Sequence, residues 1–499
     1  MDTVTLPITE AAVPQKGHPR GLYTLFFTEM WERFSYYGMR ALLVLFMVAT
    51  IEKGGMGLTD KMAAAIYGLY TAAVYLAALP GGWVADRFLG AQRSVWYGGI
   101  LIVIGSFLLV VPRTETFYLG LVFVVLGTGM LKPNISAMVG ELYPEGGARR
   151  DAGFTIFYMG INLGAAISPL IAGTIGEKVN WHYGFGVAGL GMVLGLIQFH
   201  FTKKHLGTAG LHPGHREAVK ARDWAILSSI VGALLLSIVL VYTGVLHINP
   251  IAMARGTAYL ILGVAVLYFT SAFFFFGLTN DEKKRVGVIM VLFIASAMFW
   301  SGFEQAGSSL NLFGERYTDR VLAFLGGYEF PASAFQSLGP IFVIGLAPVA
   351  ASLWVWLARR NLNPSLPLKF ALGLLLLALG FAVMAWGAMY VAKGQKVLPT
   401  WLIATYLIHT FGELCLSPVG LSSVTRLSPK RLVGQMMGLW FLATALGNLI
   451  AGVMAGEFNA NAVHEMPGRY FQIVLSAAAT GVLLLIVIKP VKALMKDVK

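Results

Sequence analysis

The sequence FTEMWERFSYYG, residues 27–38, lies inside a long apolar run from about Leu22 to Thr50. Such a run is long enough to cross a membrane as an α-helix, which needs about 20 residues. Glu29, Glu32 and Arg33 stand at positions i, i+3 and i+4, so they share one face of that helix. A charge near the bilayer centre costs about 2.5–3.5 kcal/mol, unless it faces protein or water and is neutralised. The stretch therefore predicts a polar site inside a helical bundle, in preference to a cluster at the headgroup level.

The composition places this site in a helical membrane protein. The chain has 499 residues, of which 57% are hydrophobic and only 12% charged. The net charge is +13. Cytoplasmic loops of membrane proteins carry an excess of Lys and Arg, which explains this charge more simply than binding to nucleic acid would, so no nucleic-acid partner is expected. The single cysteine, Cys415, permits no intrachain disulfide and is expected to be a packing residue.

Fourteen apolar segments have the length of a membrane span, and they predict an all-α polytopic fold. They lie near residues 21–50, 60–86, 94–112, 115–140, 150–175, 183–202, 222–246, 257–278, 286–312, 332–358, 367–392, 398–426, 431–456 and 468–494. Basic residues gather in alternate loops, for example Arg87 with Arg93, and Arg359 with Arg360. Both termini are therefore predicted to be cytoplasmic.

An internal repeat divides the chain into halves. The sequence from Leu131 to Pro144 aligns with that from Leu416 to Pro429, so the fourth span corresponds to the tenth of a twelve-span frame. Two repeated halves around a central site are typical of secondary transporters. The predicted organisation is a tail (1–20), a six-helix bundle (21–202), a linker with an inserted transmembrane hairpin (203–285), a second six-helix bundle (286–494) and a tail (495–499).

Three further charges fall inside predicted spans: Lys132, Glu304 and Glu413. Pro133 beside Lys132 suggests an interrupted helix that lines a cavity, although a lysine that reaches the membrane surface is an alternative. The two glutamates are either static structural partners or members of ion pairs that break and re-form between the halves. Because pairing stabilises the charged form of a carboxylate, such a pair could take up and release a proton.

A site with both signs of charge selects a zwitterionic ligand. Arg33 and Lys132 suit a carboxylate, a glutamate suits an ammonium group, and Asn162 and the tyrosines suit a peptide bond. Walls of aromatic and methionine side chains tolerate varied apolar groups.

These motifs closely resemble the proton-dependent oligopeptide transporter family of the major facilitator superfamily, over essentially the whole chain. The resemblance rests on Glu-x-x-Glu-Arg-Phe-x-Tyr-Tyr-Gly at 29–38, Gly-Trp-Val-Ala-Asp-Arg-Phe-Leu-Gly at 82–90, Leu-Lys-Pro-Asn at 131–134, Phe-Tyr-x-x-Ile-Asn-x-Gly at 157–164, Phe-Glu-Gln-x-Gly at 303–307 and Gly-Glu-x-x-x-x-Pro-x-Gly at 412–420. It implies the major facilitator fold, two six-helix bundles, with the inserted hairpin of bacterial members.

The resemblance also implies roles for individual residues. The proton-coupling group would be Glu29, Glu32, Arg33 and Glu304. The peptide-binding group would be Arg33, Tyr36, Tyr37, Tyr75, Lys132, Asn162, Glu304, Glu413 and Trp440. Lys132 and Glu413 would also form a gating ion pair between the halves, and Asp86 and Arg87 match a cytoplasmic gating loop.

Two positions depart from the family pattern. Gly339 stands where the family usually has an asparagine that helps bind the peptide amine. Glu413 and Asn162 are therefore expected to contribute more to binding of the amine in this protein. Gly68 stands where mammalian members carry a proton-binding histidine, so proton coupling is expected to rest on the glutamates.

The resulting hypothesis is a proton-coupled symporter of di- and tripeptides, which works by alternating access in a bacterial inner membrane. It is expected to act as a monomer, with the proton as coupling ion and with neither a cofactor nor a metal. The alternatives are a symporter of the same fold for nitrate, amino acids or drugs, a gradient-independent channel or sensor, and a membrane-embedded enzyme. An enzyme is disfavoured because no nucleophile with an adjacent base is evident in the sequence.

Overall fold

The computed structural model describes residues 17–145, 147–211, 219–322, 326–362, 364–458 and 462–495. Most of the two predicted tails, 1–20 and 495–499, lies outside these ranges. The described chain is almost entirely helical, apart from a short antiparallel pair in which Val321 of β1 (Val321–Leu322) faces Glu329 of β2 (Tyr328–Glu329).

The described part of the N-terminal half contains seven α-helices. Two of them, α5 and α6, form one span together with the π-helical turn η3 (Pro169–Gly173), which joins them. The seven helices are α1 (Arg20–Val48), α2 (Asp60–Val84), α3 (Ala91–Leu108), α4 (Thr114–Glu141), α5 (Gly147–Ser168), α6 (Thr174–Lys178) and α7 (Trp181–Thr202). Glycines let α1 approach α5 closely, since a side chain at Gly164 would meet Met30 O at 2.2 Å.

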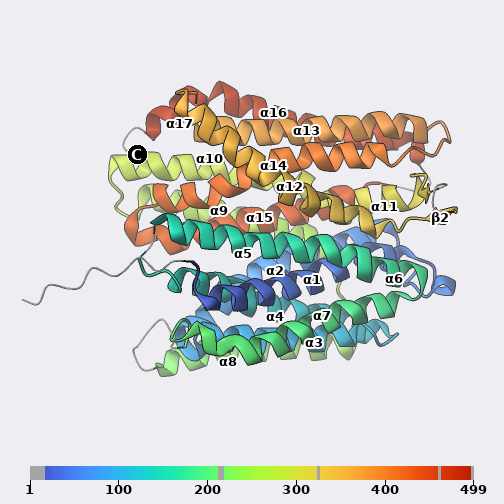
Figure 1. The fold of residues 1–499 in the computed structure, drawn as a ribbon, viewed down its shortest axis with the longest axis horizontal. Helices are drawn as coiled ribbons and strands as arrows, with labels where there is room; N and C mark the ends of the chain where they lie inside the picture. Colours follow the sequence, from blue (N-terminus) through green and yellow to red (C-terminus); the bar gives the residue numbers. More distant parts are fainter. Residues whose placement is uncertain are drawn as a thin grey trace, which may run out of the picture.

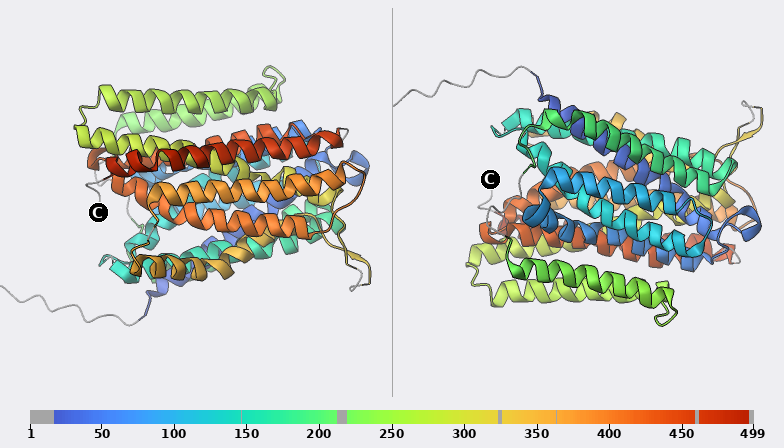
Figure 2. Two further views of the ribbon diagram at one scale, coloured as in Figure 1. Left: turned by 90° about the horizontal axis from the view of Figure 1, so that it is seen from above. Right: turned by 90° about the horizontal axis from the view of Figure 1, so that it is seen from below.

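Two helices, α8 (Ala221–Tyr242) and α9 (Pro250–Phe274), form the inserted hairpin between the halves. Figure 2 shows both on the same outer face of the molecule. The apolar window of α8 is not buried at all, whereas α9 packs on α2 of the N-terminal half and on α15 of the C-terminal half.

The C-terminal half follows the hairpin. Its helices are α10 (Asn280–Phe303), α11 (Ser309–Arg316), α12 (Leu338–Arg359), α13 (Leu366–Val391), α14 (Thr400–Leu427), α15 (Val433–Ala455), α16 (Met466–Ile486) and α17 (Ile488–Leu494). A capping box starts α10: Thr279 accepts a hydrogen bond from Glu282 N, and Thr279 N donates to Glu282 Oε2.

Twelve helical segments of the described chain are long and apolar enough to cross a membrane. The other two predicted spans correspond to α1, which carries buried charges, and to α3. The predicted all-α fold is therefore confirmed. The two helices that the repeat aligns, α4 and α14, are both 28 residues long, and the repeat itself stays a prediction.

One local expectation is wrong. Pro133 does not interrupt α4, which continues to Glu141. Beside the proline, the Asn134 side-chain amide donates to Met130 O at 2.6 Å. The break lies elsewhere: α10 ends at Phe303, and the 3₁₀ turn η5 (Glu304–Gly307) carries Glu304 before α11 begins.

The two ends of the molecule differ in how the halves meet. The helix α17 lies at one end, here called the terminal end, while α6 and β2 lie at the opposite, distal end (Figure 1). Among the described residues, every side-chain hydrogen bond or ion pair between the halves involves residues from Arg40 to Lys61 or the end of α6. The halves are thus held together from mid-membrane to the distal end.

Candidate functional site

The conspicuous charges of α1 form a compact buried cluster. Arg33 Nε lies 3.1 Å from Glu29 Oε1, and Arg33 also pairs with Glu32. The three side chains are at most 4% exposed. The predicted interior placement is therefore right, and a cluster at the headgroup level is not what the structure has.

This cluster keeps unused polar atoms. Glu29 Oε2 and Arg33 Nη2 are buried without a hydrogen-bond partner among the described residues. Most buried polar atoms in proteins are hydrogen-bonded. The α1 cluster is thus incompletely satisfied, as a site that must also bind something else would be.

Lys132 extends the site from α4. Its Nζ lies 4.2 Å from the centre of the Tyr75 ring on α2, in a cation–π contact. Its charge also interacts with the α1 cluster and with Glu304. The helices α1, α2 and α4 therefore bring Tyr75 and Lys132 to the predicted proton-coupling group.

Glu304 enters from the other half and pairs with a residue that the sequence analysis missed. Arg40 Nη2 lies 2.5 Å from Glu304 Oε2, and Arg40 Nε donates to Tyr67 Oη at 2.6 Å. Both charged side chains are at most 8% exposed. The sequence did contain a signal for Arg40. It stands seven residues after Arg33, about two helical turns, so it lies on the same face of the helix.

Aromatic rings surround this second ion pair. The Arg40 guanidinium lies 5.6 Å from the Tyr37 ring centre and 5.7 Å from that of Tyr67, while Arg33 lies 5.3 Å from Tyr36. Tyr36 and Tyr37 contact each other edge to face. The predicted tyrosines of α1 therefore line the space between the Arg33 cluster and the Arg40–Glu304 pair.

Glu413 on α14 is partly buried and lies close enough to Glu304 for their charges to interact. No ion pair within 4.0 Å joins it to Lys132, and both residues belong to the described part of the chain. The gating pair is not formed in this conformation, so it stays a prediction for another one. Asn162 donates to Tyr158 O at 3.0 Å, and the charge of Glu413 interacts with Tyr158.

Trp440 takes a different position from the other predicted residues. It is 9% exposed, its ring lies 6.2 Å from that of Phe370, and it fills the space beside Gly420. In this conformation the structure places it within the packing of the C-terminal half, and a contact with peptide remains a prediction.

The two departures from the family pattern have distinct surroundings. A side chain at Gly68 would meet the Cα atom of Gly452 at 3.0 Å, where α2 crosses α15 of the other half. A histidine does not fit there in this conformation. Gly339 faces open space within 4 Å, so a larger side chain can be accommodated.

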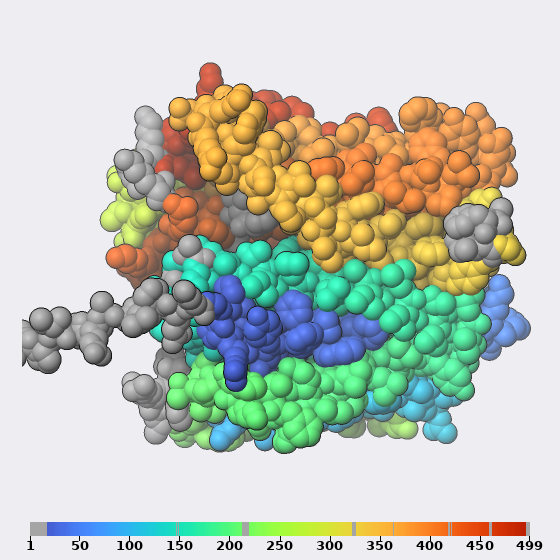
Figure 3. Space-filling view, viewed as in Figure 1, coloured from blue at the N-terminus to red at the C-terminus, as the bar shows by residue number. Residues whose placement is uncertain are grey.

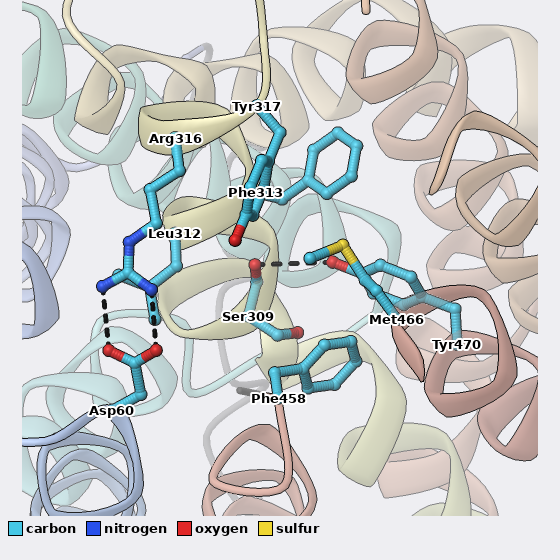
Figure 4. A pocket seen from close by; sticks show the side chains of 9 residues that line it. All are labelled: Asp60, Ser309, Leu312, Phe313, Arg316, Tyr317, Phe458, Met466 and Tyr470. Carbon is cyan, nitrogen blue, oxygen red and sulfur yellow. Dashed lines mark hydrogen bonds and ion pairs between the residues drawn. The ribbon is translucent and has the colours of Figure 1, made fainter. Parts of the chain in front are cut away.

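Further contacts between the halves lie on the distal side of the site. Arg316 binds Asp60 through two hydrogen bonds, of 2.6 and 2.8 Å, and both residues line one side of a cavity of about 20 Å³ (Figure 4). Glu177 at the end of α6 accepts hydrogen bonds from Ala332 N and Ser333 N across the interface. These charge-assisted bonds are stronger than neutral ones, so they hold α2 and α6 against the C-terminal half.

The predicted gating loop contacts the hairpin. Arg87 Nε lies 3.8 Å from Asp223 of α8, and the Phe88 ring packs 4.9 Å from that of Trp224. Asp86 is exposed. Within the described ranges, no group of three or more His, Cys, Asp or Glu residues could hold a metal ion.

Opposed charges from two helical halves, buried at mid-membrane in a polytopic bundle, define the class of a membrane transporter. A model of the POT family matches residues 92–471, which is more than half of the sequence, so the chain belongs to the POT family. The family is one of transporters.

Relatives cover nearly the whole chain. The chain is 42% identical to the peptide transporter YePEPT of Yersinia enterocolitica over 96% of both proteins. It is 38% identical to a di-/tripeptide transporter of Lactococcus lactis subsp. lactis, which covers 97% of the chain and 98% of the relative.

Solved structures agree with the fold. A crystal structure of the peptide transporter POT in complex with sulfate has a TM-score of 0.89 and 41% identity, with 98% of both chains covered. A POT family transporter in complex with 5-aminolevulinic acid has a TM-score of 0.86 and 35% identity, and covers 96% of this chain and 99% of that one.

Proposed function

We propose that this protein is a proton-coupled symporter of di- and tripeptides that works by alternating access. The observation that carries the proposal is a buried group of opposite charges from the two halves. The N-terminal half contributes the α1 cluster, Lys132 and Arg40, and the C-terminal half contributes Glu304, which pairs with Arg40 across the interface. The names of the relatives support peptides as substrates.

The charges suggest how a peptide binds. Arg33, which keeps a buried Nη2 atom without a partner, and Lys132 attract the peptide carboxylate. Glu413, which has no ion pair among the described residues, attracts the amine together with Asn162. The tyrosines around them, Tyr36, Tyr37 and Tyr75, contact the peptide backbone and side chains.

The same charges suggest how a proton is coupled to movement. A proton on Glu304 removes the negative charge that holds Arg40, and this ends an ion pair between the halves. A proton on Glu32 or Glu29 weakens its pull on Arg33 and frees the guanidinium for the peptide carboxylate. Proton uptake thus loosens the interface and prepares the peptide site in one event.

The proposal includes the setting in which the protein works. The protein acts as a monomer in a bacterial inner membrane, with both termini in the cytoplasm, so the distal end faces outward. The proton gradient supplies the energy, and no cofactor is needed. In this orientation, the distal contacts correspond to an outward side that is closed.

The proposal is tested by two modes of transport in proteoliposomes. Glu32→Gln is expected to abolish uphill accumulation of dialanine yet leave exchange of dialanine across the membrane measurable, since exchange needs no net proton movement. Glu465→Gln is the control, because the ion pair of this carboxylate among the described residues is with Arg469, four residues along the chain. Full uphill uptake by Glu32→Gln would remove Glu32 from the coupling role.

Competition separates peptides from other substrates of the same fold. Unlabelled trialanine is expected to block dialanine uptake, and nitrate and free alanine are expected to leave it unchanged. 5-Aminolevulinic acid is a useful competitor, because a related transporter was crystallised with it. Stronger competition by nitrate or by free alanine than by trialanine would reassign the substrate.

A further inference from the structure

The terminal end of α12 carries a basic surface rich in tryptophan that the proposed transport site does not use. This α12 surface consists of Trp356, Arg359 and Arg360, and it is flanked by Trp354, about 200° round the helix from Trp356, and by Lys369 from the first turn of α13. The Arg360 guanidinium lies 4.3 Å from the centre of the Trp356 ring, and Lys369 Nζ lies 4.8 Å from that of Trp354. Each aromatic ring thus holds a cation in place.

No acidic side chain neutralises these cations locally. The sequence contains neither Asp nor Glu between Glu329 and Glu413. Among the described residues, Arg359, Arg360 and Lys369 form no ion pair within 4.0 Å. The α12 surface therefore has a net positive charge that an external anion can balance.

A shallow, open face of this one helix, here called the groove, runs from these charges along α12. It has a volume of about 390 Å³ and is lined by Ala351, Ser352, Val355, Trp356 and Arg359, which share one face of α12. The lining covers about 12 Å of helix at 1.5 Å per residue. Its basic part lies at the end of the span, and its smaller, mainly apolar part lies deeper in the membrane.

The α12 surface lies where lipid can reach it. Figure 3 shows the end of α12 on the lateral outside of the molecule, in yellow-orange near the terminal end. Trp356 is 47% exposed. Tryptophan is typical of the boundary between the hydrocarbon core and the headgroups, and basic residues near it attract anionic lipids.

We propose that the α12 surface binds an anionic phospholipid of the leaflet at the terminal end. Arg359 and Arg360 hold the headgroup phosphate, and one acyl chain lies along Ala351 and Val355. A zwitterionic lipid is disfavoured because the surface offers no carboxylate to its ammonium group. A free phosphate is disfavoured because it leaves the apolar part of the groove unfilled.

Binding is measured by thermal unfolding of the purified full chain in detergent. Phosphatidylglycerol is expected to raise the unfolding midpoint in a saturable manner, whereas phosphatidylcholine and inorganic phosphate are not. In R359Q/R360Q the half-saturating concentration is expected to rise about 30-fold, since each basic residue near an anionic lipid contributes a factor of about five. The control K489Q/K492Q removes two exposed charges of α17 at the same end and is expected to behave as the parent.

Each other outcome overturns the proposal. An equal shift with phosphatidylcholine shows no anion requirement, and an equal shift with inorganic phosphate shows a site for a simple anion. Equal weakening in both double variants shows a general effect of surface charge. An unchanged half-saturating concentration in R359Q/R360Q shows that the lipid binds elsewhere.

A fluorescence measurement gives an answer even if R359Q/R360Q does not fold. Brominated phosphatidylglycerol quenches tryptophans that it contacts, so it is expected to quench the parent more than brominated phosphatidylcholine does. This difference is expected to disappear in W356F and to persist in W386F, whose tryptophan is 59% exposed elsewhere on the bundle. Persistence of the difference in W356F contradicts the proposed site.

Discussion

Removal of the Asp60–Arg316 pair is expected to open the distal side of the protein. The pair joins α2 to the C-terminal half through two hydrogen bonds, and the two side chains are only 17–24% exposed. Loss of such a partly buried, bidentate pair costs about 1–3 kcal/mol, because part of its energy is recovered from water. If the pair exists only in the distally closed state, Asp60→Ala shifts the open-to-closed ratio by about 5- to 150-fold.

The shift is measured by labelling a cysteine from the distal side. Leu312 lines the cavity beneath the pair and is 5% exposed, so Leu312→Cys reacts only when the distal side opens. The background is Cys415→Ser, which removes the single native cysteine. A membrane-impermeant maleimide is expected to react about 5- to 150-fold faster when Asp60→Ala is added.

Two further variants make the experiment decisive. The charge swap D60R/R316D is expected to return the labelling rate towards that of the parent. Glu465→Ala removes a carboxylate that pairs with Arg469 within one helix and is expected to leave the rate unchanged. A rate in Asp60→Ala within about two-fold of the parent, below the range expected for a coupling of this size, would refute the role of the pair in distal closure.

Three further predictions follow from individual contacts. Lys132→Ala is expected to impair both exchange and uphill uptake; unchanged affinity and unchanged transport would make Lys132 merely structural. Gly339→Asn is expected to tighten dialanine binding about 2- to 12-fold, which is the effect of one hydrogen bond, because Gly339 has open space around it for the larger side chain. Gly345→Asn is the control: Gly345 also faces open space, and this variant is expected to have no effect on dialanine binding. Equal effects of the two variants would exclude a specific contact between the introduced asparagine and the peptide. The hydrogen bond from Lys178 lowers the pKa of Glu329, so the pair stabilises the fold above the ordinary carboxyl pKa and loses this effect as the pH falls through the lowered value. The difference in unfolding temperature between the parent and Glu329→Gln is therefore expected to be constant from about pH 6 to 8 and to shrink below about pH 4; a growing difference at low pH would contradict this sign.

The fold could be read from the sequence because the membrane imposes a simple rule. A span needs about 20 apolar residues, and this length and hydrophobicity located all fourteen helical segments. Buried charges were equally readable, since Glu29, Glu32 and Arg33 have no other reason to lie inside an apolar run. The inward placement of these residues therefore needed no tertiary information.

Pairings between distant helices could not be read in the same way. Glu304 was assigned to the α1 cluster, but its ion-pair partner in the structure is Arg40, and Glu304 lies in the 3₁₀ turn after Phe303, which the sequence pattern did not reveal. The pair of Lys132 and Glu413 depends on the conformation, which a sequence does not specify. Trp440 shows a similar limit, since packing against Phe370 depends on the rotation of α15.

The central claim is coupling of peptide movement to protons, and uptake of labelled dialanine into proteoliposomes tests it most directly. Uptake is measured with and without an inward proton gradient. Accumulation above the external concentration is expected only when the gradient is present, and it is expected to be lost when unlabelled trialanine is added. Dialanine flux that is the same with and without the gradient would contradict the central claim.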